Sequence, residues 1–296
     1  MPTRICSPGA TRHSSVDRRF LDQCEQEVLH LSGAIQPHGA LVVTDGRLRV
    51  THLSANHADY LPAELGLHVG ASLTEPLARW VPALGEGRRL LQPDGIEGVA
   101  GALDLLLTRH PGGGWLFECL PGQGRDGFDP GHFNLSPPPM DADTLAERRR
   151  DLVREVAARS GFQRVMYYRF REDEDGDGEV LAEARQAEIY GSYLGLRFPA
   201  SDIPRVARTL YVRNSWRLIP DARAAAVPIL GTGAPDLSLA DLRSVSRCMA
   251  CTWPIWGCAP PCPCPSSPRI NCGPWSPAIT ANPGGCRCLC WSPWPR

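Results

Sequence analysis

Cysteines and arginines are the residues of this sequence whose types and spacing could do chemistry. Of the twelve cysteines, Cys6, Cys24 and Cys119 are scattered over the first 247 residues, and the other nine lie between Cys248 and Cys290. Cys24 stands alone in an acidic stretch, DQCEQEVLH, just ahead of a proline-glycine turn and a strand-like run. A cysteine in this place could hold a ligand, bind a metal, form half of a disulfide, or have no role.

A second stretch, LRFPASDIPRVARTLYVRNSWRLIPD, gathers arginines, aromatic residues and an aspartate. Arginine pairs bidentately with carboxylates, so the mixture suits a pocket for a large, flat ligand that carries carboxylates. The plainer interpretation is a helix with a solvated arginine face, with Asp202 as its N-cap and proline in its first turn. The residues concerned are Asp202, Arg205, Arg208, Tyr211, Arg213, Trp216 and Arg217.

Other chemical motifs are weaker. The acidic run from Asp173 matches the first half of a calcium loop, but the twelfth position, which should be a bidentate glutamate, is Ala184. A hairpin turn is therefore expected there. Cys248 and Cys251 form a single C-x-x-C knuckle in a tail without histidine, which disfavours structural zinc, and no metal site is expected. The sequence shows no recognisable arrangement of a catalytic nucleophile with a histidine, so we do not expect an enzyme.

Composition and hydropathy describe a globular chain. With a net charge of −1, the 296 residues offer no electrostatic case for nucleic acid or an anionic membrane as partner. No apolar run reaches the length of about 18 residues that a membrane span requires. The N-terminus also lacks the apolar region of a signal peptide. A cytoplasmic protein is expected.

The elements that must position these residues read as α+β. Alternating runs flank Asp45-Gly46, a strong hairpin signal. A first part with two strands, a mixed helical stretch and two more strands has the order of a PAS-like domain, and a helix followed by strands has the order of a GAF-like domain. The strands are expected at 40–44, 48–52, 101–109, 115–120, 164–170, 179–187 and 222–229, and the helices at 55–91, 141–160 and 202–213.

Five segments follow from this pattern. They are a disordered arm at 1–19, a PAS-like domain at 20–125, a linker at 126–140, a GAF-like domain at 141–246 and a tail at 247–296. The tail is dense in Cys, Pro and Trp, contains no acidic residue, and shows neither helical nor strand periodicity. It is therefore expected to be disordered.

The cysteine stretch and the arginine-rich stretch together resemble bacteriophytochromes. Cys24 with IQPHGAL resembles the start of their PAS domain, and RVMYYRF, GEVLAEA, RFPASDIPRVARTLYVRN and DARAAAVPI resemble their GAF domain. The resemblance runs from about Phe20 to Ser246, and PASDIP with the cysteine stretch is a highly specific pair. It implies a PAS-like domain followed by an incomplete GAF-like chromophore-binding domain.

The resemblance also implies a cofactor and a set of site residues. Biliverdin, a linear tetrapyrrole, would lie in the GAF-like domain with a thioether bond to Cys24, and the backbone carbonyl of Asp202 would meet the pyrrole nitrogens. The residues implied around the isomerising ring are Tyr168, Phe198, Ile203, Pro204 and Tyr211, and those implied for the propionate carboxylates are Arg217, Arg243 and Ser246. The N-terminal arm would pass through a lasso, with Ile35 and 229–243 as the matching pieces.

The tail departs from the family pattern. After LRSVS the family continues with a Pro-Met-His run and a Tyr-Leu-x-Asn-Met-Gly stretch, and neither is present. Back-translated out of frame, Arg247 to Gly257 can read Pro-Leu-His-Gly-Val-Tyr-Leu-Ala-Asn-Met-Gly. We hypothesise a single-base frameshift near Arg247, which would remove the last GAF strands and leave a sheet edge that the proline-rich tail cannot easily complete. If genes from independent isolates encode this same tail in an intact reading frame, the hypothesis is rejected.

The function expected is that of a truncated red/far-red light photoreceptor fragment. Light would isomerise a pigment double bond, and rearranged hydrogen bonds would bias a two-state protein. The full-length family implies a homodimer, with a kinase and response-regulator output that this chain lacks. The alternative is a PAS–GAF module that senses another ligand or only dimerises, without bound pigment; a zinc-binding regulatory tail is a third and weaker possibility.

Overall fold

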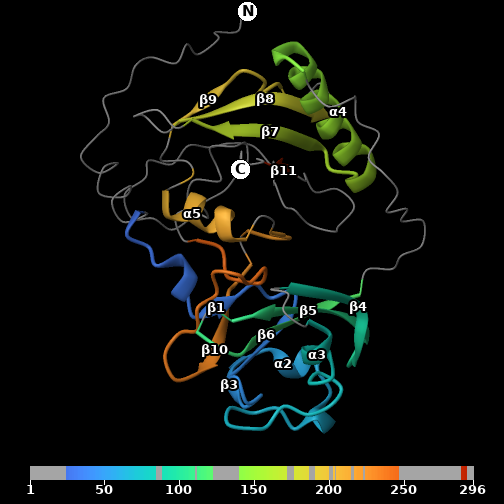
Figure 1. The fold of residues 1–296 in the computed structure, drawn as a ribbon, viewed down its shortest axis with the longest axis vertical. Coiled ribbons are helices and arrows are strands. Elements are labelled where there is room, and N and C mark those ends of the chain that lie inside the picture. Colours follow the sequence, from blue (N-terminus) through green and yellow to red (C-terminus); the bar gives the residue numbers. More distant parts are fainter. Residues whose placement is uncertain are drawn as a thin grey trace, which may run out of the picture.

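The strands form two sheets, one above the other (Figure 1). A computed structural model describes residues 25–84, 89–110, 112–122, 140–171, 177–186, 191–199, 203, 205–214, 217–222 and 224–246, and the backbone of 288–291. No helix in this part of the chain is long and apolar enough to cross a bilayer.

The first sheet has seven antiparallel strands. Their order is β1 (Ala34–Ile35), β10 (Val227–Gly231), β3 (Val50–Ser54), β2 (Ala40–Thr44), β6 (Trp115–Pro121), β5 (Gly101–Arg109) and β4 (Arg89–Gly98). The predicted hairpin between β2 and β3 is confirmed. Asp45 fixes its turn, since its Oδ1 accepts hydrogen bonds from the amides of Arg47 at 2.8 Å and Arg49 at 2.9 Å.

The helical stretch expected up to residue 91 is much shorter in the structure. Its helices are α2 (His57–Tyr60), the 3-10 turn η2 (Ala63–Leu65) and α3 (Trp80–Leu84), and β4 already begins at Arg89. β4 pairs with β5 over most of its length, with Arg89 opposite Thr108 and Leu91 opposite Leu106. This long-range pairing overrides the local helical composition, which explains why the prediction is wrong for the last part of that stretch.

The central part of the first sheet is buried on both faces. One face packs its residues Val42, Leu105 and Phe117 against the short helices. The other face packs Leu41 and Val43 against a C-terminal segment. This double burial explains why every residue of β2 is buried, because a strand covered on both sides has no solvent face.

That C-terminal segment, Val227 to Arg243, contacts Ile35 from two sides. Ile35 pairs with Val227 of β10 on one edge and forms an antiparallel bridge to Arg243 on the other. Its side chain is fully buried with Leu237 and Leu242. The contact expected between Ile35 and 229–243 is therefore present, and the strand expected at 222–229 lies in the first sheet rather than with the second set of strands. Where the PAS-like and GAF-like domains divide stays a prediction.

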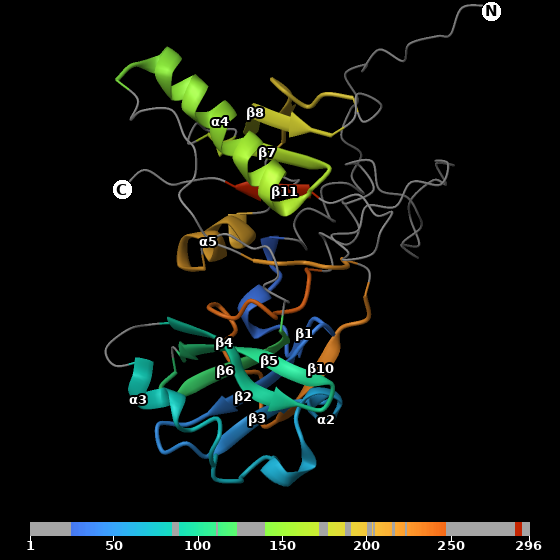
Figure 2. The ribbon, with the colours of Figure 1, turned by 90° about the vertical axis from the view of Figure 1, so that its right-hand side faces the viewer.

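The second sheet has four strands and carries a long helix on one face (Figure 2). Its order is β11 (Cys288–Trp291), β7 (Arg164–Phe170), β8 (Gly178–Arg185) and β9 (Arg197–Phe198). The helix is α4 (Ala142–Ser160), as predicted. Asp141 and Thr144 form a capping box at its start, and Gly161, with φ of 63°, ends it.

β11 corrects one expectation for the tail. Cys288–Trp291 runs parallel to β7, with Cys288 opposite Arg164 and Trp291 opposite Tyr167. The prediction of an unstructured tail is wrong for these four residues. They lie within the longest stretch of the tail without proline, so all their backbone donors are free to join a ladder.

Candidate functional site

An aromatic cluster occupies the face of the second sheet opposite α4. Tyr168 of β7 is 2% exposed, and its ring centroid lies 5.2 Å from that of Phe170 and 6.1 Å from that of Phe198 on β9. Tyr193 extends the cluster, with its ring 6.0 Å from Phe198. Alternate residues of a strand share a face, so the run RVMYYRF places Tyr168 and Phe170 together. The resulting aromatic wall is mostly apolar.

Gly178 makes room for Tyr168. A Cβ atom at this position would overlap the Tyr168 ring and hydroxyl. We expect Gly178→Ala to displace the Tyr168 side chain and to lower the free energy of unfolding by about 1–3 kcal/mol, the usual cost of overpacking. Denaturant unfolding measures this change. Gly46→Ala is the matched control, because a Cβ there meets nothing within 4 Å, and equal effects of the two substitutions would contradict the packing described.

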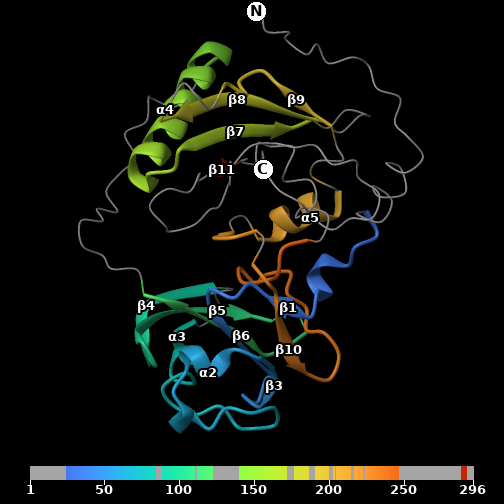
Figure 3. The ribbon, with the colours of Figure 1, turned by 180° about the vertical axis from the view of Figure 1, so that it is seen from behind.

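Helix α5 (Arg205–Arg213) lies between the two sheets (Figure 1 and Figure 3). Ile203, just before the helix, packs both on the aromatic cluster and on Leu29 and Leu210. The Arg208 Nε donates a 2.7 Å hydrogen bond to the Ile203 carbonyl, which fixes the entry into the helix. α5 therefore joins the second sheet to the segment from Glu25 to Leu31, which is called the N-terminal arm from here on.

The arm itself reaches the start of α5. The Oε1 of Glu25 accepts a 2.9 Å hydrogen bond from the amide of Arg205, one of the amides that a helix start leaves unpaired. Two residues on, the Oε2 of Glu27 accepts a 2.7 Å hydrogen bond from the Ser246 hydroxyl. The residue that directly follows Cys24 is thus held at the end of α5 nearest Ile203.

Arg217 and Arg243 lie close together in the fold. The Nη2 of Arg217 donates hydrogen bonds to the carbonyls of Arg243 and Ser244. Burial lowers the pKa of both guanidinium groups, and burial together with Arg217 lowers that of Arg243 to about 10. In the described part of the chain, the buried Nε atoms of both arginines lack a hydrogen-bond partner. Two close cations with spare donors are suited to binding carboxylates.

A buried polar network supports these arginines from the first sheet. Arg89 of β4 lies 2.6 Å from the Oδ1 of Asp241, and Asn214 donates a 2.8 Å hydrogen bond to the same oxygen. Glu118 of β6 accepts a 2.6 Å hydrogen bond from the amide of Leu242. Asn214 comes three residues before Arg217, and Asp241 two before Arg243, so the network fixes both segments that carry the arginines.

The structure brings most of the predicted site residues into two neighbouring groups. Tyr168, Phe198 and Ile203 meet in the aromatic cluster, and Arg217, Arg243 and Ser246 lie near the arm. Tyr211 is half-buried on α5 and lies near enough to both arginines to affect their electrostatics. The predicted Cys24, Asp202 and Pro204 lie outside the described residues.

Two sets of buried or partly buried ionisable residues were missed by sequence reasoning. One is the network of Arg89, Glu118 and Asp241, and the other is the pair Arg164 and Glu183 on the aromatic face. The only sequence signal was a charged residue within an apolar strand run, such as the glutamate in WLFECL. The buried Cys119 is free, and burial raises the pKa of its thiol to about 12, which leaves it unreactive at neutral pH.

Comparison with known proteins points to one group. A family model described as a PAS fold matches residues 24–87. The chain is 34% identical over 268 residues to a bacteriophytochrome of Pseudomonas aeruginosa, covering 79% of this chain and 33% of that protein. It is 36% identical over 267 residues to a bacteriophytochrome of Xanthomonas campestris pv. campestris, covering 76% and 38%. The chain thus spans about one third of the length of these curated relatives.

Solved structures similar to this chain come from the same group of proteins. The chromophore-binding domain of a mutant Stigmatella aurantiaca bacteriophytochrome in the Pr state matches with a TM-score of 0.61 at 34% identity, covering 80% of this chain and 83% of that one. The wild-type chromophore-binding domain of Stigmatella aurantiaca phytochrome P1 matches with a TM-score of 0.58 at 35% identity, covering 77% and 80%.

Proposed function

The chain belongs to the phytochrome family, and we propose that it is a red/far-red photoreceptor fragment that binds biliverdin covalently through Cys24. Phytochrome relatives with solved chromophore-binding domains match most of the chain. The proposal goes further, to the identity of the pigment, its point of attachment and the use of light-driven isomerisation for signalling. As the family resemblance implies, we also propose that full-length members of the family are homodimers that signal through an output region.

The observation that carries the proposal is the hydrogen bond between Glu25 and the amide of Arg205. It ties the residue after Cys24 to the start of α5, where Ile203 packs on the Tyr168 cluster. A cysteine next in sequence to Glu25 would therefore be close to a ligand lying against that aromatic wall. Proximity of this kind can raise the rate of an addition reaction by orders of magnitude.

The residues present fit a long, flat ligand that carries carboxylates. The Cys24 thiol would add to a vinyl-type carbon, with its sulfur bonded to that carbon and its proton delivered to the neighbouring one. The backbone carbonyl of Asp202 would accept hydrogen bonds from pyrrole nitrogens. When bound, biliverdin would supply light absorption and a double bond that isomerises. The residues that would surround that bond are Tyr168, Phe198, Ile203, Pro204 and Tyr211.

Arg217, Arg243 and Ser246 would bind the two propionates. The buried Nε atoms of the two arginines, which lack partners among the described residues, support this role because unpaired buried donors are costly. Arg217 now donates to the Arg243 and Ser244 carbonyls, so a change in its carboxylate partner would be felt by the backbone of the segment that contacts Ile35. This gives a route from pigment to protein.

Titration with biliverdin tests the proposal. We expect the full chain to give a red-absorbing complex whose spectrum changes under red light and returns in darkness or far-red light. A chain that is folded but binds no biliverdin would contradict the proposal, and would favour a PAS–GAF module for another ligand or for dimerisation.

Arg243→Lys should weaken biliverdin binding. Lysine keeps the charge but loses the planar fork and its second donor, so we expect the apparent dissociation constant to rise about tenfold, the value of one charge-assisted hydrogen bond. Absorbance titration measures this change. Arg213, the exposed last residue of α5, provides the control, Arg213→Lys, which should bind like the parent. An unchanged affinity for Arg243→Lys would remove this residue from the site.

A further inference from the structure

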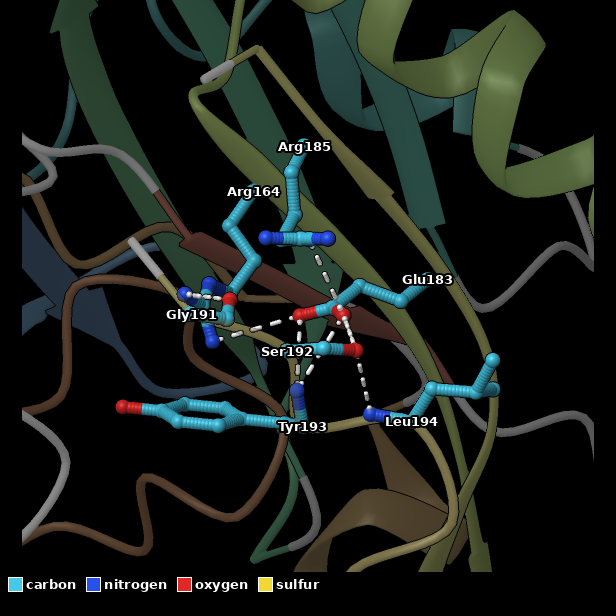
Figure 4. Close-up of polar contacts among 7 residues, drawn as sticks. All are labelled: Arg164, Glu183, Arg185, Gly191, Ser192, Tyr193 and Leu194. Atoms are coloured by element: carbon cyan, nitrogen blue, oxygen red, sulfur yellow. Dashed lines mark hydrogen bonds and ion pairs between the residues drawn. The ribbon is translucent and has the colours of Figure 1, made fainter. Parts of the chain in front are cut away.

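A charged pair is buried on the aromatic face of the second sheet (Figure 4). The Nη1 of Arg164 on β7 lies 3.2 Å from the Oε1 of Glu183 on β8, and their side chains are 5% and 3% exposed. Arg185 approaches the other carboxylate oxygen at 3.4 Å. Alternation along β7 places Arg164 on the same face as Met166 and Tyr168, so the pair borders the aromatic cluster.

Glu183 holds the turn that precedes β9. Its Oε2 accepts a 2.8 Å hydrogen bond from the Ser192 hydroxyl, and its two oxygens receive the amide of Tyr193 at 3.3 and 3.1 Å. The Ser192 Oγ in turn accepts a 3.2 Å hydrogen bond from the amide of Leu194. One carboxylate thus fixes three consecutive residues, directly or through one hydroxyl.

Arg164 also contacts this turn. Its Nη2 donates a 3.0 Å hydrogen bond to the Gly191 carbonyl, and its guanidinium carbon lies 3.8 Å from the centroid of the Tyr193 ring. The planar guanidinium therefore determines both where the turn begins and how the Tyr193 ring lies. A lysine could not meet both demands and still pair with Glu183.

The turn leads directly into the aromatic cluster. Tyr193 contacts Phe198 edge to face, and Phe198 contacts Tyr168. An apolar pair of similar volume would cover this part of the sheet without the cost of burying two charges. Unlike apolar contacts, the hydrogen bonds and the ion pair of Arg164 and Glu183 are directional, so they fix the turn in one geometry.

We propose that Arg164 and Glu183 are positioning residues that set the Tyr193–Phe198 wall and thereby tune the absorption and photoconversion of the bound pigment. This inference rests on the proposed function for its second half, the effect on the pigment. Its first half, the placement of the turn, concerns the protein alone and can be measured without pigment.

The first experiment compares Glu183→Gln with Glu179→Gln in the full chain. Glu179 lies on the same strand and pairs with Arg169 at 2.9 Å, but on the exposed side, with Arg169 51% exposed. Hydrogen exchange of the amides of Tyr193 and Leu194 should be about tenfold faster in Glu183→Gln and unchanged in Glu179→Gln, with α4 protected equally in both. Equal exchange in the two variants would overturn the positioning role.

The second experiment loads the same variants with biliverdin. We expect Glu183→Gln to bind the pigment in the parental amount but with a shifted absorption maximum and a changed photoconversion yield. Glu183→Asp, which keeps the charge, should lie between it and the parent. Faster exchange with an unchanged spectrum would overturn the link to the pigment. Failure of the parent chain to bind biliverdin would instead contradict the proposed function, while the exchange data would still decide on positioning.

If Glu183→Gln does not fold, Arg164→Lys decides by the same two measurements. It keeps the ion pair but loses the fork that reaches Gly191 and Tyr193. Parental exchange and a parental spectrum in this variant would contradict the proposal.

Discussion

Replacing Asp241 with alanine is expected to lower the free energy of unfolding by about 3 kcal/mol, the lower end of the cost of breaking a buried ion pair. The carboxylate is 6% exposed, lies 2.6 Å from Arg89 and accepts a hydrogen bond from Asn214. Its loss leaves the Arg89 guanidinium, itself only 28% exposed, without its carboxylate. Chemical denaturation of the parent and the variant measures the difference.

Asp151→Ala provides the control. Asp151 also pairs with an arginine, at 3.8 Å from Arg154, but on the surface of α4, where Arg154 is 70% exposed. Exposed pairs contribute about 0.2–1 kcal/mol, so this variant should stay close to the parent. Similar losses for the two variants would show that Asp241 does not stabilise the junction between the first sheet and the arginine segments.

The stability of the chain should fall by about 2 kcal/mol as the pH rises from 6.5 to 8, because of Glu118. Burial, reinforced by the Asp241 carboxylate, raises the pKa of Glu118 from 4.5 to about 8. Between these values the folded chain keeps a proton that the unfolded chain has lost, so stability is full below pH 4.5 and is lost as the pH rises through 8. Unfolding free energies measured across this interval test the prediction.

The interval from pH 6.5 to 8 separates the effect of Glu118 on stability from that of His38. Burial, together with the nearby Arg217, lowers the pKa of His38 from 6.5 to about 4, so its contribution to the pH dependence lies below pH 6.5. Glu118→Gln should abolish the decline between pH 6.5 and 8. A variant that retains the parental slope would assign that slope to another group.

Local signals in the sequence were sufficient for several elements. The capping pattern at Asp141 and the glycine at 161 delimited α4 to within one residue, and the run at Arg164–Phe170 gave β7 at its observed bounds. These elements are determined by caps, turns and alternation, which are properties of neighbouring residues. β4 and β10 were misjudged because their places depend on strands far away in the chain.

The residues of the candidate site also fall into those that the sequence predicted and those that it did not. The arginines and aromatic residues near PASDIP formed a recognisable set because they lie close together in sequence. The pairs Arg89–Asp241 and Arg164–Glu183 join residues 152 and 19 positions apart, and neither strand reveals its partner. Buried charges of this kind become visible only when the fold brings the two strands together, and they are the groups that fix the geometry of the site.

The most direct test of the central claim is covalent pigment attachment in the full chain and in Cys24→Ala. After incubation with biliverdin and denaturing electrophoresis, zinc-induced fluorescence reports pigment that remains bound to the protein. We predict a fluorescent band for the parent chain and none for Cys24→Ala, with the variant still coloured before denaturation. A band of equal strength in Cys24→Ala, or the absence of any band from the folded parent chain, would contradict attachment through Cys24.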